Sequence, residues 1–221
     1  MEKSNRRAAA IDVDGSTFKT EYFREILPKA LACLYPPQIV QTQFTAEITQ
    51  FYVPKQGYDF KMHIEHYGIK FDLARANLID ALSKYELIFD DALAMYDRLD
   101  RNPYTDMWNV TVGVRGTQEL KVELMRRELK RRLQRRLRPI GCIVVDWNKG
   151  EYLSELWASG FTMGGKSYSS ALLIEDHPEQ IKTLAPRPGL EIYQVVRKGA
   201  KYPAIIGRDD VHQIPELGPI S

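Results

Sequence analysis

Two aspartates near the amino terminus have the spacing of a phosphotransfer site. In the segment IDVDGST, Asp12 and Asp14 form a D-x-D pair, in which one carboxylate could attack phosphorus and the other donate a proton. Such a pair needs a buried strand before it, whereas the preceding RRAAAI is short and begins with charged residues. The local sequence therefore argues against catalysis by this pair.

A second segment matches the phosphate-loop pattern. GFTMGGKS, residues 160–167, satisfies G-x-x-x-x-G-K-[ST], whose glycines let backbone amides approach a phosphate that Lys166 would neutralise. A phosphate loop joins a buried strand to a helix, but EYLSELWAS precedes this one and YSSALLIED, which reads as a strand, follows it. A glycine-rich hairpin turn is the competing interpretation. A P-loop-like nucleotide-binding enzyme is kept as the alternative function.

His63 and His66 form an H-x-x-H pair, which on a helix would place both imidazoles on one face. Apolar and polar residues alternate around them, which favours a strand and sends the two rings to opposite faces. No nearby cysteine completes a ligand set. We therefore predict no catalytic residue, no cofactor site and no metal site.

The strongest signal is a basic, helix-patterned segment at residues 121–138. It holds nine Lys or Arg against Glu123 and Glu128, a net charge of +7, while the whole chain carries +2. Val122, Met125, Leu129 and Leu133 fall on one stripe that would pack on a sheet, and most cations lie opposite. The expected partner-binding residues are Arg126, Arg127, Lys130, Arg131, Arg132, Arg135, Arg136 and Arg138.

Several targets are open for this cationic face. Arginine suits bidentate contacts to nucleic-acid phosphates, and a protein partner is equally compatible. A solvated face stabilised by i,i+4 pairs, Glu123 with Arg127 and Glu128 with Arg132, is the simplest alternative. The chain's own acids could also meet the arginines, within or between subunits. These acids are Asp80, Glu86, Asp90, Asp91, Asp97 and Asp100.

The elements that must position these residues follow from periodicity and turn signals. They predict an α+β fold, with a mixed β-sheet flanked by helices. The expected elements are a helix at 17–34, a β-hairpin at about 44–64, a long helix at about 72–101, a strand-helix-strand crossover at about 107–147, and strands at 170–174, 190–197 and 204–206.

Length and composition place these elements in one domain. The 221 residues are 44% hydrophobic, enough for one core, so we expect a single domain over residues 1–207 and an extended tail over 208–221. Cys33 and Cys142 are expected to be buried, reduced thiols. The sequence shows neither a signal peptide nor a run of about 20 apolar residues, so we expect a cytoplasmic protein without membrane contact, or one built into a particle assembled in the cytoplasm.

The segregated charge, without a complete catalytic constellation, favours a non-catalytic subunit of a larger assembly, such as a virus or phage particle or a nucleoprotein complex. This subunit would use the basic helix to dock onto other protein subunits of an oligomer, and onto DNA or RNA as a further partner.

Overall fold

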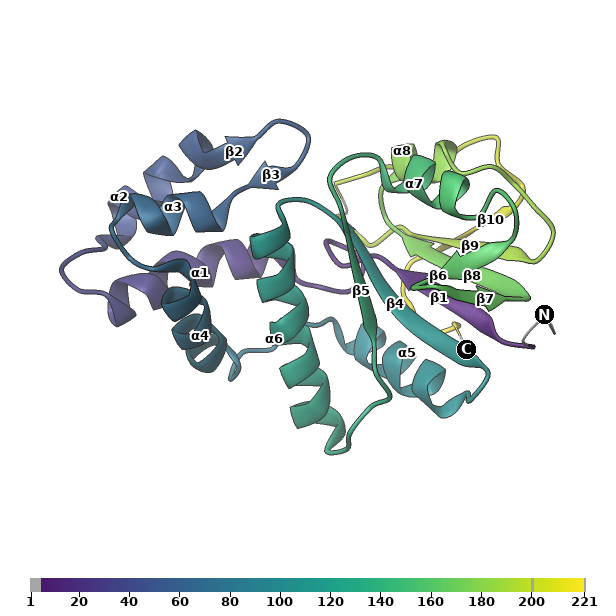
Figure 1. The fold of residues 1–221 in the computed structure, drawn as a ribbon, viewed down its shortest axis with the longest axis horizontal. Coiled ribbons are helices and arrows are strands. Elements are labelled where there is room, and N and C mark those ends of the chain that lie inside the picture. The colour runs from purple at the N-terminus through teal and green to yellow at the C-terminus, as the bar shows by residue number, and fades with distance from the viewer. Residues whose placement is uncertain (1–4, 200, 221) are drawn as a thin grey trace.

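A six-stranded parallel sheet forms the centre of the molecule (Figure 1). The computed structural model describes residues 5–199 and 201–220, so residues 1–4 and 200 of the expected domain and residue 221 of the expected tail lie outside the described residues. The strand order is β10-β9-β8-β1-β4-β5, and all five neighbouring pairs are parallel. The strands are β1 (Arg7–Ile11), β4 (Thr105–Val112), β5 (Gly141–Val145), β8 (Ser170–Glu175), β9 (Leu190–Val195) and β10 (Val211–Ile214).

Helices cover both faces of this sheet. Side chains alternate along β1, so Ala9 and Ile11 join the core beneath α5 and α6, while Ala8 and Ala10 join the core beneath α7 and α8. The chain runs outward from β1 in both directions, which creates a topological switch point next to β1, where ligands of open α/β sheets bind. The covering helices are α5 (Asp90–Arg101), α6 (Arg115–Leu133), α7 (Lys149–Leu156) and α8 (Pro178–Lys182).

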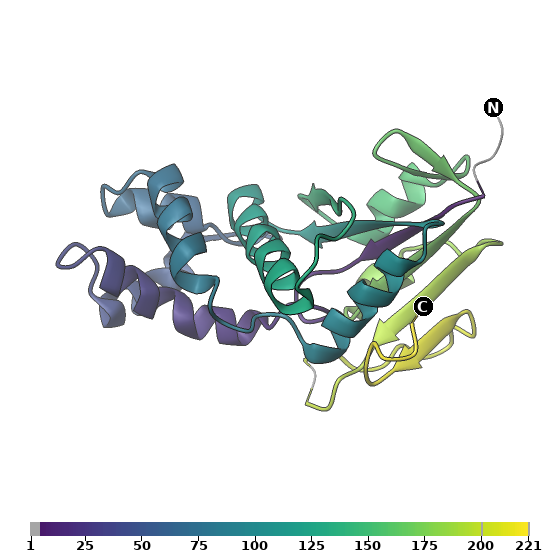
Figure 2. The same cartoon turned by 90° about the horizontal axis from the view of Figure 1, so that it is seen from below.

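The remaining helices form a unit inserted between β1 and α5. Both views place α1–α4 at one end of the molecule, beyond the sheet (Figures 1 and 2). This cap consists of α1 (Thr20–Leu34), α2 (Gln41–Glu47), a 3-10 turn (Ile48–Phe51), the two-residue strands β2 (Tyr52–Val53) and β3 (Gly57–Tyr58), α3 (Phe60–His66) and α4 (Phe71–Leu82).

The expected helix, sheet and crossover are largely confirmed. The predicted sheet flanked by helices is present. Antiparallel strands in the described residues form the hairpins β2–β3 and β6 (Phe161–Met163)–β7 (Lys166–Tyr168), and an isolated antiparallel bridge joins Phe18 and Ile88. The predicted crossover is the parallel unit β4–α6–β5. Residues 204–206 form no strand, and Cys33 is exposed, not buried, whereas Cys142 is half-buried. No helix in the described part of the chain is both long and apolar enough to span a membrane.

The hairpin predicted at about 44–64 is wrong except at its turn. Only β2 and β3 pair there, over two residues each, and helices flank them. In α3, Phe60 and Ile64 are buried four residues apart, whereas Met62 between them is 56% exposed, so the burial has helical period. The local signal was Asp59, whose side chain accepts a hydrogen bond from the Met62 amide at 3.0 Å and caps the helix.

The long helix predicted at about 72–101 is wrong because residues 83–89 leave the helix between α4 and α5. The amides of Leu87 and Ile88 donate to Glu128 Oε2 of α6, at 2.7 and 3.1 Å, and both side chains are buried. The Lys19 amide also donates to the Leu87 carbonyl at 2.7 Å. These long-range bonds outweigh the helical spacing, and no Pro or Gly marks the break in the sequence.

Residues 208–221 contribute the edge strand β10, and two of their side chains, Leu217 and Ile220, are buried in the larger core. Asp91, in the first turn of α5, anchors this segment. Its carboxylate accepts a bidentate pair from Arg197 at 2.8 and 3.0 Å and a bond from the Leu217 amide at 2.8 Å. Asp91 therefore joins α5 to the end of β9 and to the carboxyl-terminal segment.

We predict that Asp91→Asn lowers the free energy of unfolding by about 1–3 kcal/mol, because it weakens charge-assisted hydrogen bonds at a largely buried site. Burial alone would raise the pKa of Asp91, but the hydrogen bonds from Arg197 and Leu217 outweigh it and lower that pKa. The ionised Asp91 carboxylate therefore stabilises the folded state fully above the unfolded-state pKa of about 3.9. This stabilisation is lost as pH falls through the lower folded-state pKa. Denaturant unfolding of both proteins across acidic pH should show a difference that is constant near neutrality and shrinks only below about pH 4. A difference that grows on acidification would contradict this role.

Candidate functional site

The loop after β1 holds the D-x-D pair at the switch point of the sheet. The sequence argument against a strand is wrong, because β1 is central and its small residues Ala8, Ala9 and Ala10 are fully buried between two layers of helices. Gly15 permits the turn that follows. Its φ is +80°, and a Cβ there would lie 2.2 Å from Asp176 Oδ2, so both the backbone and the neighbouring carboxylate require glycine.

Asp12 belongs to a buried ion cluster at the carboxyl edge of the sheet. Lys149, the first residue of α7, donates from Nζ to Asp12 Oδ1 and to Glu175 Oε2. All three residues are at most 4% exposed. Burial and Glu175 raise the pKa of Asp12 to about 7, although Lys149 opposes this shift. Burial alone would lower the pKa of Lys149, but the two carboxylates outweigh it and raise that pKa.

The same edge offers ligands for a divalent cation. Asp12, Glu175 and Asp176 each present a carboxylate oxygen, and these oxygens lie within 4.8 Å of one another. Asp12 Oδ2 is buried without a hydrogen-bond partner in the described structure. Burial, then the charges of Asp12 and Glu175, raises the pKa of Asp176 to about 9. Three hard oxygen donors that together carry excess negative charge fit Mg²⁺.

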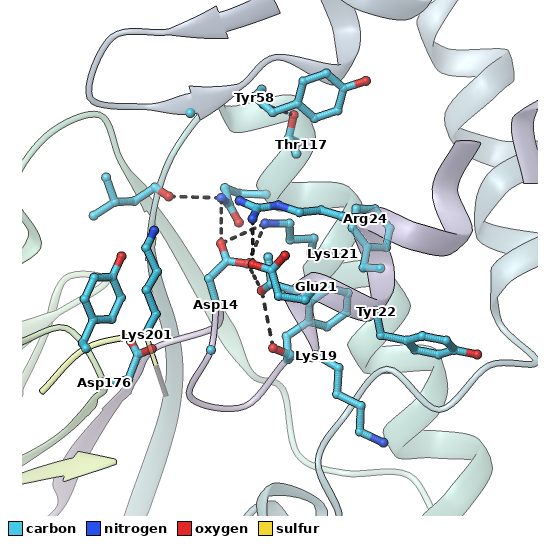
Figure 3. Close-up of a pocket in the computed structure, with 18 of the residues that line it drawn as sticks. Asp14, Lys19, Glu21, Tyr22, Arg24, Tyr58, Thr117, Lys121, Asp176 and Lys201 are labelled. Atoms are coloured by element: carbon cyan, nitrogen blue, oxygen red, sulfur yellow. Dashed lines mark hydrogen bonds and ion pairs between the residues drawn. The ribbon is translucent and has the colours of Figure 1, made fainter. Parts of the chain in front are cut away.

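Asp14 faces a pocket beside this cluster (Figure 3). Lys121 Nζ, from α6, lies 2.6 and 2.8 Å from its two carboxylate oxygens, and Gln118 Nε2 donates to it at 3.1 Å. Thr20, the first residue of α1, donates to Asp14 Oδ1 at 2.5 Å. Burial alone would raise the pKa of Asp14, but Lys121 and these hydrogen bonds outweigh it and lower that pKa. Asp14 is therefore an anion in an ion pair with Lys121.

The pocket has a volume of about 1060 Å³ and lies between the sheet edge and the cap. The sheet side contributes Asp14 and Asp176, α6 contributes Lys121, and the cap contributes the start of α1 and the β2–β3 hairpin with Tyr58. A buried carboxylate next to a second carboxylate, a lysine and a candidate metal site can carry out nucleophilic displacement with proton transfer.

Asp12 and Asp14 are the only two of these residues that the sequence brought forward. Lys149, Glu175 and Asp176 lie far from them along the chain and meet them only because β1, β5 and β8 end at one edge. The available signal was the strand SSALLIE followed by Asp176, which places two acids at a carboxyl end. Asp146, which also follows a strand, is exposed and lies outside the site.

Most of the predicted partner-binding arginines are engaged within the chain. The stripe predicted to pack inward is confirmed, since Val122, Met125 and Leu129 are buried and Leu133 packs against the same core. The contacts are Arg127 with Asp80, Arg132 with Asp90 and Glu128, Arg135 with Asp97 and Asp100, Arg138 with Asp100, Arg126 with the Ile140 carbonyl, and Arg131 with the Tyr85 carbonyl. Lys130 and Arg136 alone of the eight form no such bond in the described residues. Binding of an outside partner by these residues stays a prediction.

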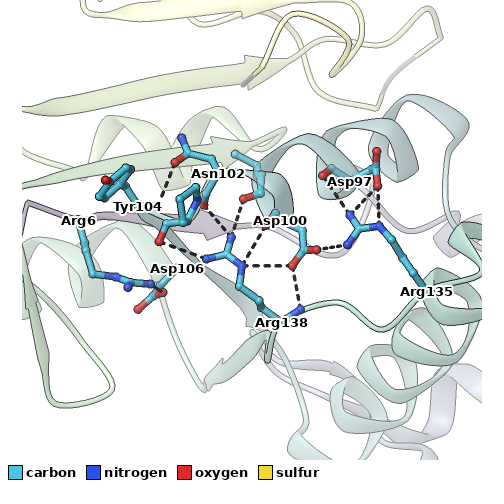
Figure 4. Close-up of polar contacts among 10 residues, drawn as sticks. Arg6, Asp97, Asp100, Asn102, Tyr104, Asp106, Arg135 and Arg138 are labelled. Atoms are coloured by element: carbon cyan, nitrogen blue, oxygen red, sulfur yellow. Dashed lines mark hydrogen bonds and ion pairs between the residues drawn. The ribbon is translucent and has the colours of Figure 1, made fainter.

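Arg138 terminates α5 (Figure 4). Its guanidinium donates to the carbonyls of Leu99, Asp100 and Asn102 at 2.8, 3.0 and 2.8 Å. These carbonyls are at the carboxyl end of the helix, where helical partners run out. The charge that suggested an exposed binding face thus caps a neighbouring helix.

The phosphate-loop hypothesis is wrong and the hairpin turn is confirmed. Residues 160–167 span β6, a turn at Gly164 and Gly165, and the start of β7, and no helix begins at Lys166. Both glycines have positive φ, at 55° and 77°. Lys166 Nζ lies 3.3 Å from Asp106 Oδ2 at the opposite end of the sheet strands from Asp12.

His63 and His66 lie on helix α3, not on the predicted strand. His63 is buried and stacked between Phe44 and Phe51, with ring centroids 3.8 and 4.2 Å apart. His66 is exposed. Neither histidine joins the candidate metal group found in the described residues.

Comparison with known proteins identifies the fold. Neither a scan of protein-family models nor a search of curated proteins finds a match. Solved structures do match over nearly the full length. A protein described as a haloacid dehalogenase-like hydrolase from Burkholderia xenovorans has a TM-score of 0.61 at 13% identity, covering 97% of this chain and 94% of that one. An L-2-haloacid dehalogenase has a TM-score of 0.54 at 15% identity, with 96% of each chain covered.

A third match is the HAD-type hydrolase YfnB from Bacillus subtilis, in a magnesium-bound form, with a TM-score of 0.51 at 15% identity and 96% of each chain covered. At these identities the likeness establishes a shared fold. The interpretation as a structural, non-catalytic subunit of a virion or other assembly is wrong, because the solved structures that share this fold are described as hydrolases and dehalogenases. In addition, most of the arginines expected to dock are engaged in internal contacts.

We predict that Lys149→Met lowers the free energy of unfolding by about 3–5 kcal/mol, because it leaves buried carboxylates without their cation. Lys166→Met is the matched control, since this lysine is 66% exposed and should contribute less than about 1 kcal/mol. Chemical denaturation without divalent cations measures both. Equal effects of the two substitutions would show that the cluster does not stabilise the fold.

We predict that Arg138→Ala costs about 1.5–3 kcal/mol of stability, because it removes charged donors from the end of α5. Lys130→Ala removes one positive charge from the same segment without removing a bond and should change stability by less than about 0.5 kcal/mol. Thermal unfolding of the two variants at moderate salt separates capping from overall charge. Similar values would indicate that only the charge matters.

Proposed function

We propose that this protein is a metal-assisted phosphate monoester hydrolase with Asp12 as the nucleophile. The observation that carries the proposal is the state of the Asp12 carboxylate: Oδ1 accepts from Lys149, whereas Oδ2 is buried and unpartnered beside the Asp14 pocket. The hydrolase fold of the structural neighbours supports the proposal.

Asp12, Glu175 and Asp176 would hold the divalent cation, and the magnesium in the YfnB structure makes Mg²⁺ the first choice. When bound, such a cation offsets the charge between the carboxylates and the phosphoryl oxygens. Thr111, near the carboxyl end of β4, has a buried hydroxyl without a partner among the described residues and would donate to a phosphoryl oxygen.

In the first step, Asp12 Oδ2 attacks phosphorus and forms a P–O bond as the bond to the leaving oxygen breaks. The leaving oxygen takes a proton from the Asp14–Lys121 pair, which holds one transferable proton between Lys121 Nζ and the two Asp14 oxygens. The products are a phosphorylated Asp12 and a free alcohol.

In the second step, water attacks the phosphorus of phosphorylated Asp12, and the bond between phosphorus and Asp12 breaks. The proton of that water returns to the Asp14–Lys121 pair, so inorganic phosphate leaves and both groups are restored. Lys149 keeps Asp12 oriented and balances its charge throughout.

Two structural neighbours are L-2-haloacid dehalogenases, so displacement of halide from carbon is the competing reaction. Halide leaves without a proton, whereas an alkoxide needs one. The proton-carrying Asp14–Lys121 pair and the three carboxylates suited to a cation therefore favour a phosphate ester.

The test compares substrates whose leaving groups differ in basicity. We expect Asp12→Asn to abolish Mg²⁺-dependent phosphate release from both p-nitrophenyl phosphate and an alkyl phosphate, because both need the nucleophile. Asp14→Asn should lower kcat on the alkyl phosphate by about 10²–10⁴, and much less on p-nitrophenyl phosphate, whose leaving group departs without a proton. Steady-state phosphate release measures both effects.

Lys166→Gln, a change far from the pocket, is the control and should retain activity. Halide release from a 2-haloacid should be absent. Phosphate release that survives Asp12→Asn, or halide release that depends on Asp12, would overturn the proposal.

A further inference from the structure

The pocket carries more positive charge than one phosphate requires. Seven Lys or Arg line it, against the three carboxylates of Asp14, Glu21 and Asp176. Three of the cations have partners: Lys121 pairs with Asp14, Arg24 with Glu21 at 2.7 Å, and Arg197 with Asp91. The other four are Lys19, Lys55, Lys198 and Lys201, and none of them pairs with a carboxylate of the described residues.

These charges can be balanced against the substrate that the proposed function requires. A divalent cation together with Lys149 would balance Asp12, Glu175 and Asp176. A phosphate monoester brings nearly two negative charges, which leaves about two of the four lysine charges unmatched. A second phosphate on the same molecule would match them, and charges held in one cleft act on a bound ligand together.

Two of the lysines, Lys19 and Lys55, are placed to bind an anion away from the reacting phosphate. Figure 3 shows Lys201 beside Asp176, whereas Lys19 extends away from Asp14. Lys55 stands on the turn of the β2–β3 hairpin of the cap. The four lysines therefore reach the pocket from three parts of the chain: just before α1, the turn of the cap hairpin, and the segment after β9.

The size of the pocket agrees with a substrate larger than a simple phosphate. Its volume of about 1060 Å³ is at the upper end of sites that hold drug-sized ligands, roughly 300–1,000 Å³. Tyr22, Tyr52, Tyr58 and Tyr202 line it and supply flat contact surfaces with polar tips.

Building on the proposed function, we infer that the substrate is a small organic bisphosphate, in which Asp12 attacks one phosphate and the unpaired lysines bind the other. The second phosphate stays on the leaving group, so the reaction releases one inorganic phosphate and a monophosphate.

The experiment compares matched pairs with Mg²⁺ present: fructose bisphosphate against each fructose monophosphate, and adenosine bisphosphate against each adenosine monophosphate. We expect kcat/KM for the bisphosphate of at least one pair to exceed that of its monophosphates by about tenfold or more, since a charge-assisted bond contributes about that factor. The pair, fructose or adenosine, with the larger bisphosphate-to-monophosphate ratio of kcat/KM indicates the kind of leaving group. Added salt should reduce the ratio.

Three charge-removing variants locate the second phosphate: Lys19→Gln, Lys55→Gln and the double change Lys198→Gln with Lys201→Gln. At least one should lower the bisphosphate-to-monophosphate ratio of kcat/KM by about tenfold. Lys130→Gln, on the far part of α6 and outside the pocket, is the matched control and should leave the ratio unchanged.

A binding measurement distinguishes failure of this inference from failure of the proposed function. Calorimetry with Asp14→Asn, which retains all three metal-binding carboxylates, measures affinity while turnover is slow. Tighter binding of bisphosphates without any hydrolysis by the wild-type protein would overturn the proposed function and support the second-phosphate site. Equal kcat/KM and equal affinity for both members of both pairs would overturn the inference while leaving a phosphatase. Neither hydrolysis nor binding of any probe would overturn both.

Discussion

The bridge from Lys149 to Asp12 and Glu175 is the interaction on which the site and much of the sheet depend. Each partner comes from a different element: the loop after β1, the end of β8, and the start of α7. Burying charges is costly unless they are paired, so this cluster forms at low cost only when all three elements reach their final register. The same arrangement leaves Asp12 Oδ2 without a partner. The contacts that fix the fold at this edge therefore also leave unpartnered the oxygen to which we assign the attack on phosphorus.

Helix α6 links this edge to the rest of the molecule. Near its start, Lys121 enters the pocket and pairs with Asp14. Two turns further, Glu128 holds the backbone of Leu87 and Ile88 between α4 and α5. Beyond its end, Arg135 and Arg138 bind the last turn of α5. The net charge of +7 on this segment is thus distributed over contacts with three other parts of the chain, because the acids of α5 and its neighbours lie opposite the arginines.

Sequence reasoning found the elements whose signals are local. The crossover β4–α6–β5 was predictable because a β-branched strand, an amphipathic stripe and an apolar run follow one another. The break at residues 83–89 was not, because it depends on Glu128 some forty residues away. The D-x-D pair of Asp12 and Asp14 could be recognised in the sequence. The buried strand before it, Arg7–Ile11, could not, because its central buried residues are small alanines and not large apolar side chains. Lys149, Glu175 and Asp176 become a site only through the strand order, which the local pattern of a single sequence does not specify.

The contacts of Asp14 connect recognition to proton transfer. Thr20, which donates to Asp14 Oδ1, is the first residue of α1 and hence of the cap, while Lys121 and Gln118 belong to the helix that covers the sheet. Asp14 is therefore held from both sides of the pocket. A ligand that changes how the cap sits over the sheet would alter the Thr20 bond without touching Lys121, and so would change how Asp14 is oriented toward the leaving oxygen. Because Lys19 lies within residues 14–20 and Lys55 lies on the cap, contacts to a remote part of a substrate can act on Asp14 through this short segment and through the cap.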